Sequence, residues 1–351
     1  MKIFKILAFT TIAFFYLSCE EKTESNQDFF DVTIKNSKKT YTTNDSFTVS
    51  VINKKNKAID SVSYYLNNER ISSSSSISET NISLANQKLG VRTLHAKLYS
   101  EGNEYDVSTK LTILSSITPK LYTYKIIEEY PHDIDAYTQG LEFNKGVLYE
   151  STGFNGKSSL RKTNYTTGEV LEHVKLEDFY FAEGLTIINN KIYQLTWREK
   201  LGFIYNLETL EKTGSFVYGK SKEGWGLCND GSKIYKSDGT QKIWELNANN
   251  LSEVDYIEIY TNTSKIKSVN ELEWVEGKIY ANIYQKDAVA IVNPANGAVE
   301  GVIDFTSLKS HVTQHKALDV LNGIAYKGEP NILYITGKNW DKLFKVEIFE
   351  K

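Results

Sequence analysis

The chain has 351 residues, of which 41 are basic and 44 are acidic, and no basic run is interleaved with aromatic residues. This balance excludes nucleic acid as an expected partner, because a nucleic-acid surface needs clustered positive charge. The 23 Tyr and 16 Phe, against only 4 Pro and 1 Met, favour strands over helices, so we expect an all-β protein long enough to bury a sizeable core.

Residues 1–18 are typical of an export signal. Lys2 and Lys5 precede an apolar stretch, residues 6–15, that is too short to span a bilayer comfortably. The segment resembles a bacterial lipoprotein signal, in which Cys19 becomes the lipid-modified first residue, although Leu17 stands two rather than three positions before it. An ordinary secretory signal is the alternative. We expect a lipoprotein of the bacterial cell envelope, attached to the membrane through the lipid on Cys19 and facing the periplasm or the cell surface.

Residues 19–28 are polar and are expected to form a solvated tether. Residues 29–116 then alternate apolar and polar side chains over short runs, separated by clusters of Asn, Ser, Lys and Gly. This pattern predicts a small β-sandwich of the immunoglobulin-like kind. The name describes architecture only, because the segment lacks the Cys pair and the Trp of a true immunoglobulin domain. We see no candidate chemical group in it and interpret it as a spacer.

One short pattern recurs through the rest of the chain, and its copies start at Gly140, Gly184, Gly226, Glu271 and Gly323. Each copy predicts a strand, a tight turn rich in Asn, Gly, Asp and Lys, and a second strand rich in Tyr and β-branched residues. The period matches that of a four-stranded propeller blade. We therefore predict a five-bladed β-propeller over residues 117–351. The last hairpin has no outer strand after it, so residues 122–132 are expected to pair with it and close the ring.

Equivalent positions of propeller blades meet around the central axis, so the repeat predicts which distant residues come together. The residues directly before the repeated starts are Gln139, Glu183, Trp225, Asn270 and Asn322. We interpret them as a binding site at one end of the ring; the alternative is that these residues are polar only because the channel mouth is wet. A second ring, four positions after the repeated tyrosine of each copy, consists of Gly153, Trp197, Gly239, Tyr284 and Lys338.

Strings spread over all the repeats also carry a family resemblance. They are Ala136-YTQGLEF, Leu148-YESTG, Ser159-LRK, Phe181-AEGLT, Tyr193-QLTWRE, Glu223-GWGL, Lys236-SDGT, Asn270-ELEW, Ile279-YANIY, Asp319-VLNGIAY and Ile335-TGKNW. Residues 122–349 thereby resemble the glutaminyl-peptide cyclotransferases of the plant and bacterial type, which are five-bladed propellers. The resemblance implies a transferase that cyclises the amino-terminal glutamine of a peptide to pyroglutamate with loss of ammonia. Tyr137 stands where that family usually has Phe, and Tyr284 where Trp is common.

The reaction needs a group that moves a proton from the attacking amine to the departing ammonia. Glu183 is the only acid among the first-ring residues, and apolar neighbours would raise its pKa into the range useful for this transfer. Lys338 is expected to stabilise the developing oxyanion. We expect a pocket for the glutamine side chain, with aromatic walls and several hydrogen-bonding groups. The expected substrate-binding residues are Tyr137, Gln139, Phe181, Trp197, Trp225, Asn270, Tyr284 and Asn322.

We expect neither a metal nor another cofactor. Among the histidines only His311 and His315 have a ligand-like spacing, and that spacing needs a helix to face one metal. Two rival functions remain. One is a lipid-anchored propeller that binds peptide amino termini without turnover, and the other is a propeller lactonase, which would need several axial carboxylates to hold its metal.

Overall fold

The computed structural model describes residues 25–351, so the predicted signal, Cys19 and most of the tether lie outside the described residues. The described chain is almost entirely strand and turn, with one short helix, α1 (Asn26–Phe29), and one 3-10 turn, η1 (Leu308–His311). The expectation of an all-β protein is confirmed. Within residues 25–351, no helix has the length and apolar character that a membrane span requires.

The amino-terminal part consists of two facing sheets. One has the order β1 (Phe30–Ile34), β3 (Ser46–Asn53), β6 (Thr80–Ser83), and the other β2 (Tyr41–Thr42), β8 (Asn103–Leu114), β7 (Gly90–Ser100), β4 (Ser61–Leu66), β5 (Glu69–Ser74). Strict alternation along these strands sends every second side chain inward, so that Phe30, Val49, Tyr64, Leu94 and Ile113 are fully buried in one shared core.

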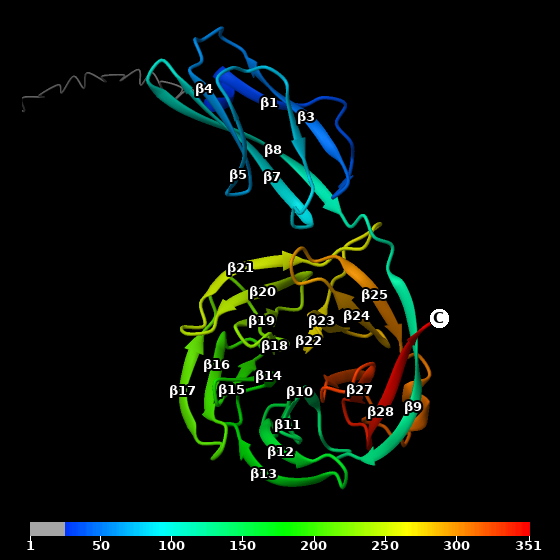
Figure 1. Ribbon diagram of the computed structural model, residues 1–351. Coiled ribbons are helices and arrows are strands. Elements are labelled where there is room, and N and C mark those ends of the chain that lie inside the picture. Colours follow the sequence, from blue (N-terminus) through cyan, green and yellow to red (C-terminus); the bar gives the residue numbers. More distant parts are fainter. Residues whose placement is uncertain (1–24) are drawn as a thin grey trace, which may run out of the picture.

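The remaining strands form a ring of sheets below this part (Figure 1). Three sheets have four strands in chain order: β10 (Thr138–Asn144), β11 (Val147–Thr152), β12 (Ser159–Asn164), β13 (Glu169–Lys175); β14 (Ala182–Ile188), β15 (Lys191–Thr196), β16 (Leu201–Asn206), β17 (Lys212–Val217); and β18 (Leu227–Asn229), β19 (Lys233–Ser237), β20 (Lys242–Asn247), β21 (Glu253–Glu258). An eight-stranded sheet completes the ring with β22 (Val269–Val275), β23 (Lys278–Ile283), β24 (Ala288–Val292), β25 (Val299–Asp304), β9 (Lys120–Pro131), β28 (Lys342–Glu350), β27 (Ile332–Gly337) and β26 (Leu321–Ala325).

Each repeated segment forms the predicted antiparallel hairpin, from β10–β11 to β26–β27. Three of these hairpins have two-residue turns, and both residues of each such turn have positive φ. Asn189 and Asn190 have φ of 54° and 58°, and Glu276 and Gly277 have φ of 46° and 84°. Turns with positive φ at both central residues match the twist of the strands they join, and Asn and Gly adopt that conformation at least cost. The turn chemistry read from the sequence therefore accounts for the hairpins.

The strand β9 closes the ring, as predicted. It pairs antiparallel with β28 along nearly its whole length, from Pro131 opposite Lys342 to Tyr122 opposite Glu350. The sequence did not predict its second partner: Lys120 to Tyr122 also pair in parallel with β25. One strand from the start of the ring thus joins its last two groups of strands into a single sheet, and neither group is left with an open edge there.

The innermost strands approach one another so closely that the repeated glycines are required. A Cβ atom on Gly184 would lie 2.6 Å from Cα of Gly226, and one on Gly226 would lie 2.3 Å from the backbone oxygen of Asn270. The space freed by the missing side chain is used by the backbone, since the amide of Gly184 donates a 2.7 Å hydrogen bond to the carbonyl of Trp225. The glycine pattern therefore brings the residues just before each repeat start together.

Where the fourth repeat has Glu271 instead of glycine, its carboxylate joins neighbouring inner strands. It accepts the backbone N–H of Leu141 at 3.5 Å and that of Ile324 at 3.1 Å. Glu142 similarly accepts the N–H of Ile187 at 3.1 Å. Burial raises the pKa of both carboxyl groups, that of Glu142 to about 8.

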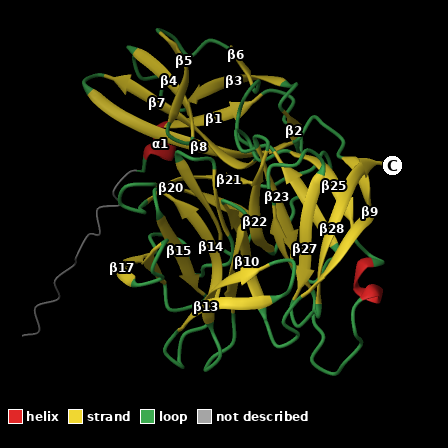
Figure 2. Cartoon of the chain, turned by 60° about the horizontal axis from the view of Figure 1, so that its bottom comes forward, coloured by secondary structure: helices red, strands yellow, loops and turns green. Residues whose placement is uncertain are grey.

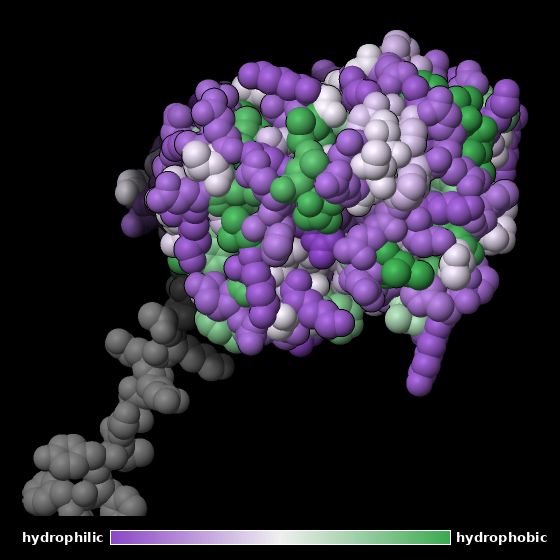
Figure 3. Space-filling model, turned by 90° about the horizontal axis from the view of Figure 1, so that it is seen from below, coloured by the Kyte–Doolittle hydropathy of each residue, from purple (hydrophilic) through white to green (hydrophobic). Residues whose placement is uncertain are grey.

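The two-sheet part packs directly against the ring (Figure 2). The amide of Leu89 donates a 3.0 Å hydrogen bond to the carbonyl of Asn296, Lys88 forms an ion pair with Asp255, and Tyr260 enters the core of the two-sheet part. Seen from below, the molecule is mainly hydrophilic, with apolar side chains in separate small patches (Figure 3).

Candidate functional site

Four of the five first-ring residues form one chain of side-chain hydrogen bonds. Nδ2 of Asn270 donates to Oδ1 of Asn322 at 2.8 Å, Nδ2 of Asn322 donates to Oε1 of Gln139 at 3.3 Å, and Nε2 of Gln139 donates to Oε1 of Glu183 at 3.2 Å. All four side chains are buried. The structure therefore brings together residues that are up to 183 positions apart in the sequence, as the repeat predicts.

Glu183 ends this chain of hydrogen bonds, and its second oxygen is not used. Within residues 25–351, Oε2 of Glu183 is buried without a hydrogen-bond partner. Burial raises the pKa of the carboxyl group well above its usual value, and the nearby charge of Lys338 opposes that rise. Its backbone is fixed from the neighbouring sheet, because Oγ of Ser151 donates to the carbonyl of Glu183. A buried acid with one restrained and one unpaired oxygen is suited to exchanging a proton with a ligand.

Lys338 lies at the same end of the ring and is 4% exposed. Its Nζ lies 4.7 Å from the centroid of the Tyr137 ring and 5.5 Å from that of Tyr284. Burial lowers the pKa of Lys338, while the charges of Glu183 and Asp319 favour its ammonium form. Asp319 also accepts a 2.7 Å hydrogen bond from the hydroxyl of Tyr137. The hydroxyl of Tyr137, which a Phe at this position would lack, therefore has a hydrogen-bond acceptor in the site.

Two tryptophans from different sheets are held by one carboxylate. Nε1 of Trp197 and Nε1 of Trp225 donate to the same Oε2 of Glu223, at 2.9 and 2.8 Å. The guanidinium of Arg198 lies 3.6 Å from the centroid of the Trp197 ring and 3.4 Å from Oε1 of Glu223. Trp225 also packs edge-on against Tyr284, with 5.6 Å between the ring centroids. Glu223 thus fixes the orientation of both indoles.

The loop that carries Glu223 is fixed by a fully buried cation. Nζ of Lys236 donates to the carbonyl of Glu223 at 2.9 Å and to Oγ of Ser221, and it lies 3.5 Å from a carboxylate oxygen of Glu253. Burial lowers the pKa of Lys236 to about 8. Because a buried ammonium is costly unless it is paired, these contacts hold the loop firmly at its place beside β18.

Glycines of the second ring leave room for aromatic side chains of the site. A Cβ atom on Gly153 would lie 2.5 Å from the ring of Phe181, and one on Gly239 would lie 2.4 Å from the ring of Trp225. The ring of Phe181 in turn lies 5.6 Å from that of Trp197. The second ring therefore contributes large side chains at Trp197, Tyr284 and Lys338, and its two glycines leave the space that neighbouring aromatic rings occupy.

Sequence reasoning missed Glu223, Arg198 and Asp319 as members of this site. All three lie in loops, outside the repeated strands, so the superposition of repeats could not place them. The family resemblance could have indicated them, because each belongs to one of the strings that carry it: Glu223-GWGL, Tyr193-QLTWRE and Asp319-VLNGIAY.

A buried ion pair supports the start of β10. Nε2 of His132 lies 3.1 Å from Oε1 of Glu150, and its Nδ1 lies 2.8 Å from the carbonyl of Trp340. The same Oε1 accepts a 2.7 Å hydrogen bond from the hydroxyl of Thr138, the neighbour of Gln139. Glu150 raises the pKa of His132 against the opposing effect of burial. This pair anchors the strand on which Gln139 lies.

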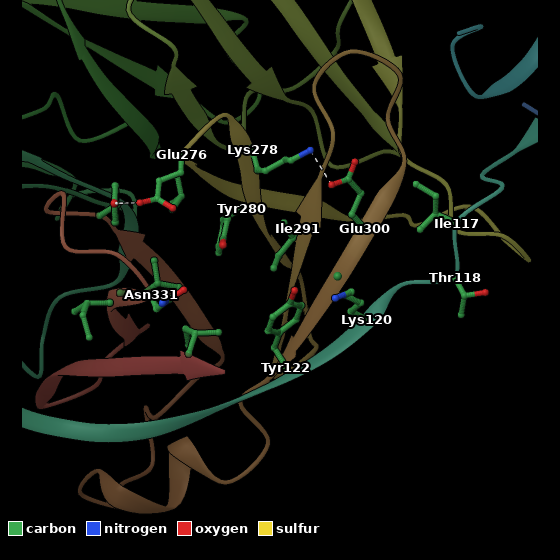
Figure 4. Close-up of a pocket in the computed structure, with 16 residues that line it drawn as sticks. Ile117, Thr118, Lys120, Tyr122, Glu276, Lys278, Tyr280, Ile291, Glu300 and Asn331 are labelled. Carbon is green, nitrogen blue, oxygen red and sulfur yellow. Dashed lines mark hydrogen bonds and ion pairs between the residues drawn. The ribbon is translucent and has the colours of Figure 1, made fainter. Parts of the chain in front are cut away.

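A cavity of about 550 Å³ lies elsewhere, where β25 and β9 diverge near the β26–β27 turn (Figure 4). Tyr122 and Tyr280 line it, and Lys278 and Glu300 form a 2.7 Å ion pair at its wall. It shares no lining residue with the hydrogen-bonded chain that ends at Glu183. Size alone does not make it the functional site, and the buried acid and amides are the groups that can do chemistry. Within residues 25–351, no three His, Cys, Asp or Glu side chains are arranged to hold a metal ion.

Comparisons with known proteins agree with this site. The family model described as glutamine cyclotransferase matches residues 92–348. A glutaminyl-peptide cyclotransferase of Arabidopsis thaliana is 34% identical over 252 residues, which cover 71% of this chain and 75% of that protein. The crystal structure of Myxococcus xanthus glutaminyl cyclase is 34% identical and superposes with a TM-score of 0.61, covering 66% of this chain and 99% of the other. The chain belongs to the glutamine cyclotransferase family.

Proposed function

We propose that this protein is a glutaminyl-peptide cyclotransferase, which converts the amino-terminal glutamine of a peptide to pyroglutamate and releases ammonia. The observation that carries the proposal is the buried Glu183 carboxyl, with one oxygen bonded to Gln139 and the other unpaired, beside the buried cation of Lys338. The names of the two relatives and membership of the family support the same reaction.

In the proposed mechanism the neutral α-amine attacks the side-chain amide carbon, so that a carbon–nitrogen bond forms and the carbonyl oxygen becomes an oxyanion. Glu183, as a carboxylate, takes the surplus proton of the amine and passes it to the amide nitrogen. The bond to that nitrogen then breaks, ammonia leaves, and the carbonyl is restored. Burial raises the pKa of this carboxyl group above its usual value, which makes it a better acceptor for the proton of the amine than an ordinary carboxylate. No cofactor takes part in these steps.

Lys338 is proposed to stabilise the oxyanion, because its ammonium lies among aromatic rings where water is scarce and charge acts strongly. Phe181, Trp197, Trp225, Tyr137 and Tyr284 are proposed to enclose the glutamine side chain. The amides of Gln139, Asn270 and Asn322 are proposed to orient it; Oδ1 of Asn270 is buried without a partner among the described residues and is free to accept a substrate N–H.

For the architecture we propose a five-bladed β-propeller over residues 117–351, preceded by an immunoglobulin-like sandwich over residues 29–116. Support comes from the three four-stranded sheets and from the eight-stranded sheet, which separates into two further groups of four if β9 serves only as the closing strand of the last. The sandwich is proposed as a spacer between the ring and the envelope membrane, to which the lipid on Cys19 and the tether, residues 19–28, would attach the protein. The sequence pattern of residues 1–19 supports this location.

The direct test is to incubate the purified protein with a peptide that begins with Gln and to follow the mass of the peptide. Cyclisation lowers that mass by one ammonia and blocks the amino terminus, and a matched peptide that begins with Asn controls for general deamidation. Binding of the Gln peptide without any mass change would favour the rival function, a protein that captures peptide amino termini without turnover.

A further inference from the structure

A groove of about 460 Å³ adjoins the candidate site and is not used by the mechanism above. It runs between the segment before β22 and the strands β23 to β25. Its floor is apolar, formed by partly buried side chains such as Ile266, Ile283 and Val302, which pack onto the core beneath. An open apolar floor of this kind favours a ligand side chain that covers it.

Three lysines surround this floor. Lys265, Lys267 and Lys286 line the groove and are exposed. Within residues 25–351 their ammonium groups have no ion-pair or hydrogen-bond partner, whereas many other lysines of the ring are paired, as Lys278 is with Glu300. No Asp or Glu lines the groove. Its rim is therefore positively charged and uncompensated, and it attracts a negatively charged ligand.

Tyr284 connects the groove to the site. The same side chain lines the groove, packs edge-on against Trp225 at 5.6 Å and lies under the ammonium of Lys338 at 5.5 Å. A peptide whose first residue lies between Glu183 and Lys338 can thus leave the site past Tyr284 and enter the groove. Each further residue of an extended chain advances it by about 3.3–3.6 Å, so the residues soon after the glutamine are the ones that reach the groove.

We infer that this groove is a specificity subsite for the residues that follow the amino-terminal glutamine. It favours an apolar residue together with an acidic one. This inference rests on the proposed function. The apolar side chain covers the floor, and the carboxylate lies at the lysine rim. The substrate class is therefore Gln-initiated peptides with an acidic residue close behind the glutamine.

The experiment compares two peptides that differ in one charge, Gln-Leu-Glu-Ala-amide and Gln-Leu-Lys-Ala-amide, with glutamine amide as a substrate too short to reach the groove. We expect kcat/KM to be roughly 3- to 30-fold higher for the Glu peptide, because exposed ion pairs contribute modestly each. The preference should shrink as salt is raised from 0.01 M to 1 M.

Charge reversal then locates the effect. In the triple variant Lys265→Glu, Lys267→Glu, Lys286→Glu, the preference should reverse in favour of the Lys peptide, while turnover of glutamine amide stays unchanged. The matched control reverses three other exposed lysines, Lys39, Lys145 and Lys191. Lys145 lies in the β10–β11 turn and Lys191 is the first residue of β15, so both are at the opposite end of the inner strands. The control variant has the same net charge and should keep the preference for the Glu peptide.

Binding supplies a measurement that does not depend on turnover. Dissociation constants of the same two peptides are measured on Glu183→Gln and on that variant combined with the triple reversal. Equal affinity and equal kcat/KM for the two peptides, with no response to charge reversal, would overturn the subsite while leaving cyclisation of glutamine amide as evidence for the proposed function. Absence of turnover for every Gln substrate would overturn the proposed function itself; a binding preference that reverses with the lysines would still support the groove.

Discussion

The side-chain amide of Gln139 donates a 3.2 Å hydrogen bond to Oε1 of Glu183, so the carboxyl group is held by one oxygen while the other has no partner in the described part of the chain. Burial favours the neutral acid and raises the pKa of this carboxyl group, whereas the charge of Lys338 favours the carboxylate. A group balanced between these two effects can change its protonation state during a reaction cycle.

Replacing Glu183 by Gln keeps the shape of the side chain and removes its proton chemistry. We expect turnover to fall by roughly 10²–10⁴ while peptide binding persists. The measurement is single-turnover mass change together with the dissociation constant of the Gln peptide. Wild-type turnover should rise with pH as Glu183 and the substrate amine lose their protons, and the acidic limb due to Glu183 should be missing in the variant. Near wild-type turnover of Glu183→Gln would rule out the proton-shuttle role.

Lys338→Ala should lower kcat by roughly 10²–10³, with a smaller change in KM, if the ammonium stabilises the oxyanion. A second effect has a definite sign. Lys338 opposes the burial that raises the pKa of Glu183, so its removal should raise that pKa further and move the acidic limb of the kcat profile to higher pH. A profile that stays in place, with all of the loss in KM, would make Lys338 a binding residue.

Glu223 is predicted to act as a positioning residue through the two indoles that it holds. Glu223→Leu removes the acceptor of both, so we expect a raised KM for Gln peptides and altered near-UV circular dichroism from Trp197 and Trp225. Glu223→Gln keeps one acceptor oxygen and should restore much of the spectrum. The matched control is Glu208→Gln on the surface. If Glu223→Leu leaves both the spectrum and KM unchanged, the indoles are fixed by packing alone.

Stability should decrease with rising pH because of the carboxyl groups between the inner strands. Burial raises the pKa of Glu142 from 4.5 to about 8. A raised folded-state pKa means that the native protein binds the proton more tightly, so this contribution is complete below about pH 4.5 and is lost as pH rises through about 8. The loss between pH 6 and pH 9 is on the order of 2–3 kcal/mol.

Urea unfolding at pH 6 and at pH 9 measures this effect. Glu142→Gln does not titrate, so the free energy of unfolding should fall less between the two pH values than in the wild type. Glu271 titrates in the same direction, so part of the slope should remain. An identical slope in the wild type and the variant would show that Glu142 is already ionised in the fold.

Metal dependence is a separate prediction. Because the proposed steps use only side chains of the protein, activity should survive EDTA and 1,10-phenanthroline. The measurement is turnover of the Gln peptide before and after prolonged dialysis against each chelator. Loss of turnover that zinc or calcium restores would contradict the prediction and indicate a metal that the mechanism lacks.

The repeat explains which parts of the fold and of the candidate site could be predicted from the sequence. A hairpin that recurs with turn residues of known preference specifies both its own fold and, through the glycines, the meeting of Gln139, Glu183, Asn270 and Asn322. Side chains that break the repeat were not predictable in this way. Glu223 lies in the loop between β17 and β18, outside the repeated strands. The carboxylate of Glu271 replaces a glycine, so its contacts with two neighbouring strands follow from the assembled ring alone.

The parallel pairing of β9 with β25 likewise could not be predicted from the repeat. The last hairpin lacks the outer strand that follows each of the other hairpins. The sequence therefore indicated that another segment must pair with β28. The contact of Lys120 to Tyr122 with Gly301 to Ile303 fills no such gap. It arises because the linker from the two-sheet part passes that edge on its way into the ring.

The pairing of β9 with β28 also determines when the protein can become native during its synthesis. Lys120 and Glu350, which form a 2.8 Å ion pair at one end of these strands, are 230 positions apart. Contacts of such long range are slow to form, because the chain between them must first lose its conformational freedom. β9 therefore leaves the ribosome long before its partner, and until β28 arrives it is an unpaired strand of the kind that associates with other chains. Export before folding, which is part of the proposed function, would avoid that exposure in the cell interior, and the last sheet would then form only after the whole chain had crossed the membrane.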